Sequence, residues 1–183
     1  YEHNELIKWF EKIDSYLISG NYKKILNSID LSKDLTLYQV MLLYNTWKKD
    51  HTLINNKKLL YLIDTQIIKY SKFSLPYLMK GIVLLDNNQL TKAVKILEKS
   101  LSCEINFDIY KMLAYSNLAQ SYKKLDQKKL SLNYAWKAIS LINKFTPGKK
   151  ERAHLVQMLE LITNYNYINY DGFKIEKINF PYR

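Results

Sequence analysis

The chain has 183 residues, a formal net charge of +11 and 48% hydrophobic residues, enough to bury a core and to argue against disorder. Its four glycines and three prolines are too few for the turns of an all-β fold or for a glycine-rich dinucleotide-binding loop. The single cysteine excludes an internal disulfide, and no apolar run reaches the roughly 20 residues that a bilayer-spanning helix needs.

Apolar residues recur at helical spacing along most of the chain and predict an all-α fold. Turn-forming pairs separate the apolar segments, as at Gly20-Asn21, Asn87-Asn88 and Pro147-Gly148. The predicted helices are, in chain order, 4–19, 21–31, 35–50, 56–72, 74–87, 90–102, 108–125, 128–144 and 149–165.

The last part of the chain, residues 168–183, has a different pattern. Polar and apolar residues alternate around Asp171-Gly172, a two-residue signal for a β-hairpin that would pair Tyr170 with Phe173. The alternative is that the ninth helix runs further and the tail is extended. An isolated hairpin is marginally stable, so it is expected to pack on the rest of the chain or on a partner.

Large side chains repeat along the chain at Trp9, Leu43, Tyr77 and Tyr115, with spacings of 34, 34 and 38 residues. A period of 34 is the length of a helix–turn–helix repeat. It predicts one domain over residues 1–167 with a tail at 168–183. The predicted hairpins span about 6–35, 36–73, 74–105 and 108–144, and a capping helix spans 149–165.

Two segments carry a more detailed motif, GIVLLDNNQLTKAVKILEKSL at 81–101 and AYSNLAQSYKKLDQKKLSLNYAWKAISL at 114–141. Small residues at Gly81, Ala93 and Ala119 let paired helices approach closely. These segments resemble the tetratricopeptide repeat family. The resemblance implies a superhelical solenoid of about four helical hairpins plus the capping helix.

The first two copies of the repeat depart from that motif. Ile13 and Ile25 replace the small residues in the first copy, and Trp47 and Leu59 replace them in the second. These hairpins are expected to sit further apart or to cross at other angles.

Residue clusters that would carry chemistry are missing from the sequence. The three histidines lie far apart, and there is neither a phosphate-binding loop nor a Cys-x-x-Cys pair. We therefore expect no enzymatic activity, no metal and no cofactor.

The family resemblance implies a groove lined by the first helix of each repeat, which would hold an extended peptide or a partner helix. The alternative for Leu78, Ile82 and Leu85 is that they are core residues. The predicted partner-binding residues are Tyr44, Lys48, Leu78, Ile82, Leu85, Asn117, Gln120, Lys123 and Lys124.

Positive charge concentrates in residues 111–152, which hold ten Lys and Arg residues against two acidic residues. We interpret this segment as a surface that steers an acidic segment of a partner protein. The alternative is RNA or DNA binding, although a segment with one arginine is a poor match for bidentate phosphate recognition. The basic patch comprises Lys128, Lys129, Lys149, Lys150 and Arg152.

The sequence thus predicts a non-catalytic adaptor or scaffold, of a composition typical of an AT-rich bacterial genome. Because the chain begins at Tyr1 and not at Met, removal of a secretory signal is one expectation and favours the envelope side of the membrane. The cytoplasm is the alternative compartment.

Overall fold

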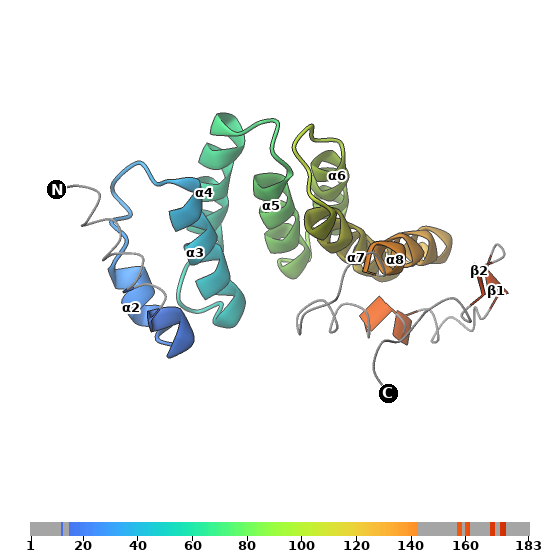
Figure 1. The fold of residues 1–183 in the computed structure, drawn as a ribbon, viewed down its shortest axis with the longest axis horizontal. Helices are drawn as coiled ribbons and strands as arrows, with labels where there is room; N and C mark the ends of the chain where they lie inside the picture. Colours follow the sequence, from blue (N-terminus) through green and yellow to red (C-terminus); the bar gives the residue numbers. More distant parts are fainter. Residues whose placement is uncertain are drawn as a thin grey trace. The chain divides into compact units, whose positions relative to one another are not determined.

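A computed structural model of the chain describes residues 12, 15–142, 157–158, 160–161, 169–170 and 173–174. Most of these residues are helical, which confirms the predicted helical character (Figure 1). Each predicted range between 21 and 144 contains one observed helix, and the ends differ by a few residues. The helices are α2 (Tyr22–Asn27), α3 (Leu37–Lys49), α4 (Asn56–Lys69), α5 (Ser74–Asp86), α6 (Leu90–Leu101), α7 (Asp108–Lys124) and α8 (Lys128–Ile142).

The chain divides into two compact units, Tyr1–Lys69 and Tyr70–Arg183. The first unit contains α2, α3 and α4, and the second contains α5 to α8. The division falls near residue 73, where the second predicted hairpin ends.

The first unit has a well-defined start to α3 and a polar link between α3 and α4. Thr36 and Gln39 form a reciprocal capping box, in which each side chain accepts a hydrogen bond from the other residue's backbone N–H. The Nε1–H of Trp47 on α3 donates to Oδ1 of Asn56 on α4, at 2.6 Å. The fully buried side chains of this unit include Ile25, Leu43, Trp47, Leu59 and Ile63.

Helices α3 and α4 approach each other less closely than α5 and α6 do. Trp47 and Leu59 stand where the regular repeat has small residues, and both are fully buried. Because large side chains hold two helix axes apart, the wider spacing agrees with the expectation from the degenerate second copy.

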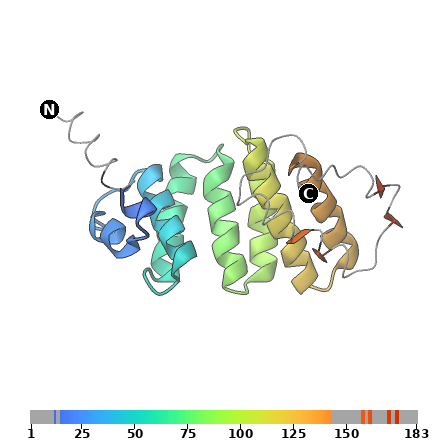
Figure 2. The same cartoon turned by 60° about the horizontal axis from the view of Figure 1, so that its bottom comes forward.

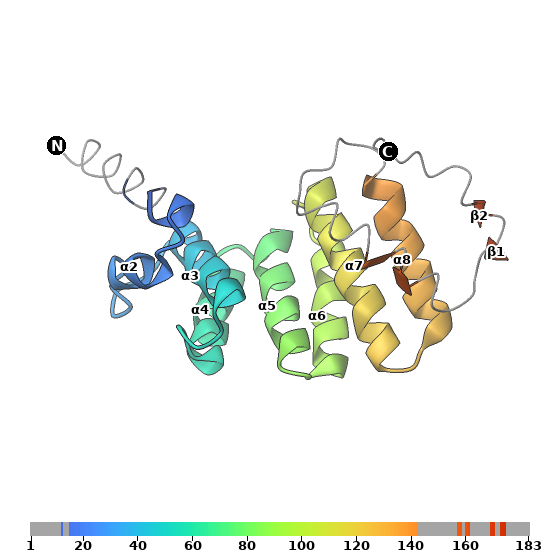
Figure 3. The ribbon, with the colours of Figure 1, turned by 90° about the horizontal axis from the view of Figure 1, so that it is seen from below.

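The second unit is a row of antiparallel helices in chain order (Figures 2 and 3). Helix α5 packs on α6, α6 on α7 and α7 on α8, and α5 also contacts α7. Gly81 allows the close approach of α5 and α6, because a Cβ atom at this position would lie 2.6 Å from both Cγ and Cδ2 of Leu97. Ser131 ties α8 to α7 by donating from its hydroxyl to the carbonyl oxygen of Ala119, at 2.8 Å.

A core cluster joins α7, α8 and part of the predicted ninth helix. Residues 157–158 and 160–161 are helical, and Met158 and Leu161 are buried in this cluster. The predicted buried face of the ninth helix is therefore confirmed at Met158, and the rest of the range 149–165 lies outside the described residues. The other members of the cluster are Met112, Ala119, Leu132, Ala135, Trp136, Ala138, Ile139, Leu141 and Ile142.

Three helix–helix turns share one backbone geometry. Gly20, Asn88 and Asp126 have φ angles of 70°, 58° and 56°, in the left-handed region. In each turn the N–H of the following residue donates to the carbonyl five residues earlier, as from Gln89 to Leu84 and from Gln127 to Tyr122. This is the Schellman pattern that ends a helix. The turn between α3 and α4 is different, since Asp50 ends α3 with extended backbone.

Two short strands near the end of the chain pair in an antiparallel manner, β1 (Asn169–Tyr170) and β2 (Phe173–Lys174). Tyr170 pairs with Phe173, which is the register that the turn at 171–172 predicts.

Candidate functional site

The three apolar residues predicted to line a groove on α5 are buried. Leu78, Ile82 and Leu85 are 2%, 6% and 5% exposed. They belong to a helix in which eleven of thirteen residues are buried. In the folded chain these side chains therefore have the environment of core residues, and a partner could reach them only after neighbouring groups moved away.

The predicted partner-binding residues outside α5 are more accessible but do not form one group. Tyr44 is half-buried with its ring centroid 5.9 Å from that of Trp47, and Lys48 is exposed, both in the first unit. In the second unit, Asn117 is half-buried and donates from Nδ2 to the carbonyl of Leu113, at 2.7 Å. Gln120 is half-buried as well.

Four predicted basic residues are brought together by the turn between α7 and α8. Lys123 and Lys124 end α7, Lys128 and Lys129 begin α8, and all four are exposed. The left-handed residue Asp126 reverses the chain between the two pairs. We name these four lysines the basic turn. Lys149, Lys150 and Arg152 of the predicted basic patch lie outside the described residues.

The helix ends explain one half of the basic turn but not the other. Lys123 and Lys124 lie beside the carbonyl end of α7, where positive charge is favourable. Lys128 and Lys129 occupy the first turn of α8, which contains no acidic residue. Positive charge at a helix amino terminus costs about 0.3–1 kcal/mol, so local helix electrostatics does not account for this pair.

A tyrosine cluster adjoins these helices and was not predicted as a site. Glu98 Oε1 on α6 accepts hydrogen bonds from the hydroxyls of Tyr122 at 2.9 Å and Tyr134 at 3.3 Å. The rings of Tyr122 and Tyr134 are parallel, with centroids 5.6 Å apart. Lys137 Nζ lies 5.0 Å from the ring centroid of Tyr134 and 5.8 Å from that of Tyr115.

The cluster perturbs the acid–base behaviour of its phenols. Burial, together with the hydrogen bond to Glu98 and the charge of that carboxylate, raises the pKa of Tyr122 to about 12. Burial and Glu98 also raise the pKa of Tyr134. Both phenols therefore stay protonated at neutral pH and act as hydrogen-bond donors to the carboxylate. Sequence reasoning assigned Tyr115 and Tyr122 to the core but could not find Glu98, which is 24 residues from Tyr122.

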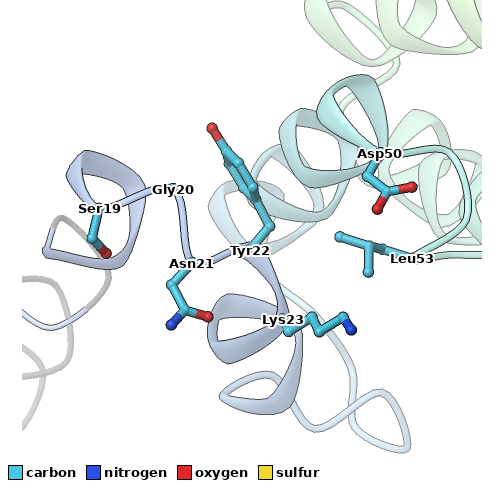
Figure 4. A pocket seen from close by; sticks show the side chains of 7 residues that line it. All are labelled: Ser19, Gly20, Asn21, Tyr22, Lys23, Asp50 and Leu53. Atoms are coloured by element: carbon cyan, nitrogen blue, oxygen red, sulfur yellow. The ribbon is translucent and has the colours of Figure 1, made fainter.

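A shallow hollow of about 340 Å³ lies in the first unit, between the turn before α2 and the loop after α3. Figure 4 shows Tyr22 and Lys23 on one side of it and Asp50 and Leu53 on the other. Asp50 accepts hydrogen bonds from the hydroxyl and N–H of Thr52, and these bonds lower the pKa of its carboxyl group. With its carboxylate already used in a local turn, Asp50 has a structural role in this loop.

Metal and membrane sites were searched for over the part of the chain that the structure describes. No group of three or more His, Cys, Asp or Glu residues there could hold a metal ion. Among the same residues, no helix is both long and apolar enough to cross a membrane. Cys103 is a half-buried free thiol whose pKa is raised by burial.

Comparison with known proteins gives no match: no family model fits the chain, and neither characterised proteins nor solved structures include a similar one.

Proposed function

We propose that the chain is a non-catalytic adaptor with a tetratricopeptide-like helical repeat, which binds a partner protein that carries an acidic segment. The observation that carries this proposal is the basic turn, in which four exposed lysines lie at one junction between α7 and α8. Because Lys128 and Lys129 are held against an unfavourable helix end, an anionic partner supplies a physical reason for their placement.

The repeat part of the proposal is supported by two observations within the second unit. Gly81 contacts Leu97 where the repeat requires a small residue. The turns at Asn88 and Asp126 have the same backbone conformation and are separated by one repeat length plus the four-residue insertion. Both observations fit a helical hairpin that is used more than once.

The acidic partner is expected at the basic turn and not along α5. The exposed lysines can contact a partner without rearrangement, whereas the α5 residues Leu78, Ile82 and Leu85 are buried. The same lysines could neutralise phosphates, so RNA binding is the alternative function. Stacking of bases on Tyr115 or Tyr134 would have to displace the Lys137 ammonium, and this favours the protein partner.

The test uses a fluorescent twelve-residue glutamate-rich peptide and, in parallel, a single-stranded RNA of about the same net charge. The variant Lys124→Glu, Lys128→Glu, Lys129→Glu reverses three charges of the basic turn. We expect the wild-type protein to bind the peptide and the variant to lose at least about tenfold in affinity, because each contact to an anion becomes repulsive.

The matched control is Lys92→Glu, Lys95→Glu, Lys99→Glu on α6, which changes the net charge equally at another exposed surface. Equal losses in the two variants would show that binding follows overall charge and would refute the assignment to the basic turn. If RNA binds tightly and with steep salt dependence while the peptide does not bind, the adaptor function is wrong and RNA binding replaces it.

A further inference from the structure

Two phenylalanines occupy equivalent positions immediately before α5 and α7. Phe73 and Phe107 are the N-cap residues of these helices, and both have extended backbone, with φ and ψ of −99° and 129° for Phe73 and of −84° and 152° for Phe107. They are 34 residues apart, which is one repeat length. What contacts the first position therefore indicates what the second position can bind.

The first position is closed by a later part of the chain. Ile105 forms a parallel β-bridge with Phe73, in which the Ile105 N–H donates to Lys72 O at 3.0 Å and Ser74 N–H donates to Ile105 O at 2.9 Å. The ring of Phe107, two residues after Ile105, packs edge-on against the ring of Phe73, with centroids 6.2 Å apart. A short extended segment, Ile105-Asn106-Phe107, thus covers Phe73.

The second position presents the same groups in an open state. One repeat after Lys72 and Ser74 stand the Asn106 carbonyl and the Asp108 N–H, and neither has a hydrogen-bond partner among the residues that the structure describes. Phe107 itself is 57% exposed, and Ile105 beside it is 50% exposed. Tyr110 forms an aromatic wall, with its ring centroid 5.6 Å from that of Phe107.

The sequence contains a second copy of the segment that closes the first position. Ile-Asn-Phe at 105–107 recurs as Ile178, Asn179 and Phe180, outside the described residues. Leu161, which is buried in the core of the second unit, precedes Ile178 by 17 residues. An extended chain of that length spans up to about 56 Å, so the tripeptide can reach any part of this unit.

We propose that Ile178, Asn179 and Phe180 bind at Phe107 of the same chain as Ile105, Asn106 and Phe107 bind at Phe73. In this arrangement Ile178 donates its N–H to the Asn106 carbonyl and accepts a hydrogen bond from the Asp108 N–H. The ring of Phe180 covers the ring of Phe107, which removes apolar surface from water. The carboxyl-terminal segment thereby acts as a strap that closes the open edge of the second unit.

The test measures hydrogen exchange of the Asp108 backbone amide in the full-length chain by NMR. In the wild-type protein this amide is expected to exchange about as slowly as the equivalent amide of Ser74, which is already hydrogen-bonded to Ile105. The variant Phe180→Ala is expected to speed the exchange at Asp108 by about tenfold or more and to leave Ser74 unchanged. Tyr182→Ala, which alters an aromatic residue two positions further on, is the matched control and should change neither amide.

Equal exchange at Asp108 in the wild type and in Phe180→Ala would overturn the proposal. A mixture of isotope-labelled and unlabelled chains distinguishes binding within one chain from exchange between two chains. Contacts between the Phe107 ring and Ile178 methyl groups that arise only between different chains would overturn binding within the same chain.

Discussion

Replacement of Gly81 by alanine sets two effects of opposite sign against each other. Alanine has a higher helix propensity than glycine by about 0.8–1.0 kcal/mol, so the substitution in a free helix would be stabilising. In this structure the new Cβ would lie 2.6 Å from two side-chain atoms of Leu97, well inside the 3.5–4.0 Å at which carbon atoms attract. Leu97 is fully buried and cannot move into solvent.

The cost of overpacking a core by a methyl group is about 1–3 kcal/mol, which exceeds the gain in propensity. We therefore expect Gly81→Ala to lower the free energy of unfolding by about 1 kcal/mol. The background variant Leu97→Ala removes Cγ and Cδ2 and costs about 2–5 kcal/mol by itself. In that background the overlap is absent, so Gly81→Ala should stabilise the protein by up to about 1 kcal/mol.

Urea unfolding of the four proteins, followed by circular dichroism at 222 nm, measures both effects. The decisive result is the change of sign between the two backgrounds. If Gly81→Ala has the same effect with leucine and with alanine at position 97, the close approach of α5 and α6 at this point does not limit stability, and the packing explanation is wrong.

Two further changes test the buried polar links. Tyr122→Phe removes the hydroxyl that donates to Glu98 and should lower stability at pH 8 by about 1 kcal/mol; because the pKa of Tyr122 is raised to about 12, this difference should be full below pH 10 and should shrink as the pH rises towards 12, and urea unfolding at pH 8 and pH 11 would contradict the linkage if the difference stayed constant. Asn56→Ala leaves the buried Trp47 N–H without its 2.6 Å acceptor and should cost about 1–3 kcal/mol, whereas Asn56→Asp keeps an oxygen acceptor and should restore most of the loss; tryptophan fluorescence during urea unfolding measures both, and equal losses would exclude this hydrogen bond as the cause.

The helices could be predicted from the sequence because their signal is local. Apolar residues at helical spacing identify each segment, and turn residues such as Gly20 and Asn88 mark the ends. The close contact at Gly81 was also predictable, since a small residue within a regular repeat implies a neighbouring helix.

The candidate site was less accessible to sequence reasoning. Helical periodicity places Leu78, Ile82 and Leu85 on one face, but it does not distinguish a groove that is open to solvent from a face covered by other residues. The hydrogen bonds from Tyr122 and Tyr134 to Glu98 join residues 24 and 36 positions apart, and they depend on how three helices are packed. By contrast, the basic turn was found because its lysines are neighbours in the sequence.

The left-handed turns at Gly20, Asn88 and Asp126 bear on how a chain of this kind can change its length. Because the backbone leaves each turn in the same way, the chain could be cut at two of these turns and rejoined without designing a new loop. Removal of the 38 residues between Asn88 and Asp126, for example, would join α5 to α8 through a turn already present in the molecule. Gain and loss of material in such a chain is therefore expected in steps of one hairpin, with a recombination point at each left-handed residue.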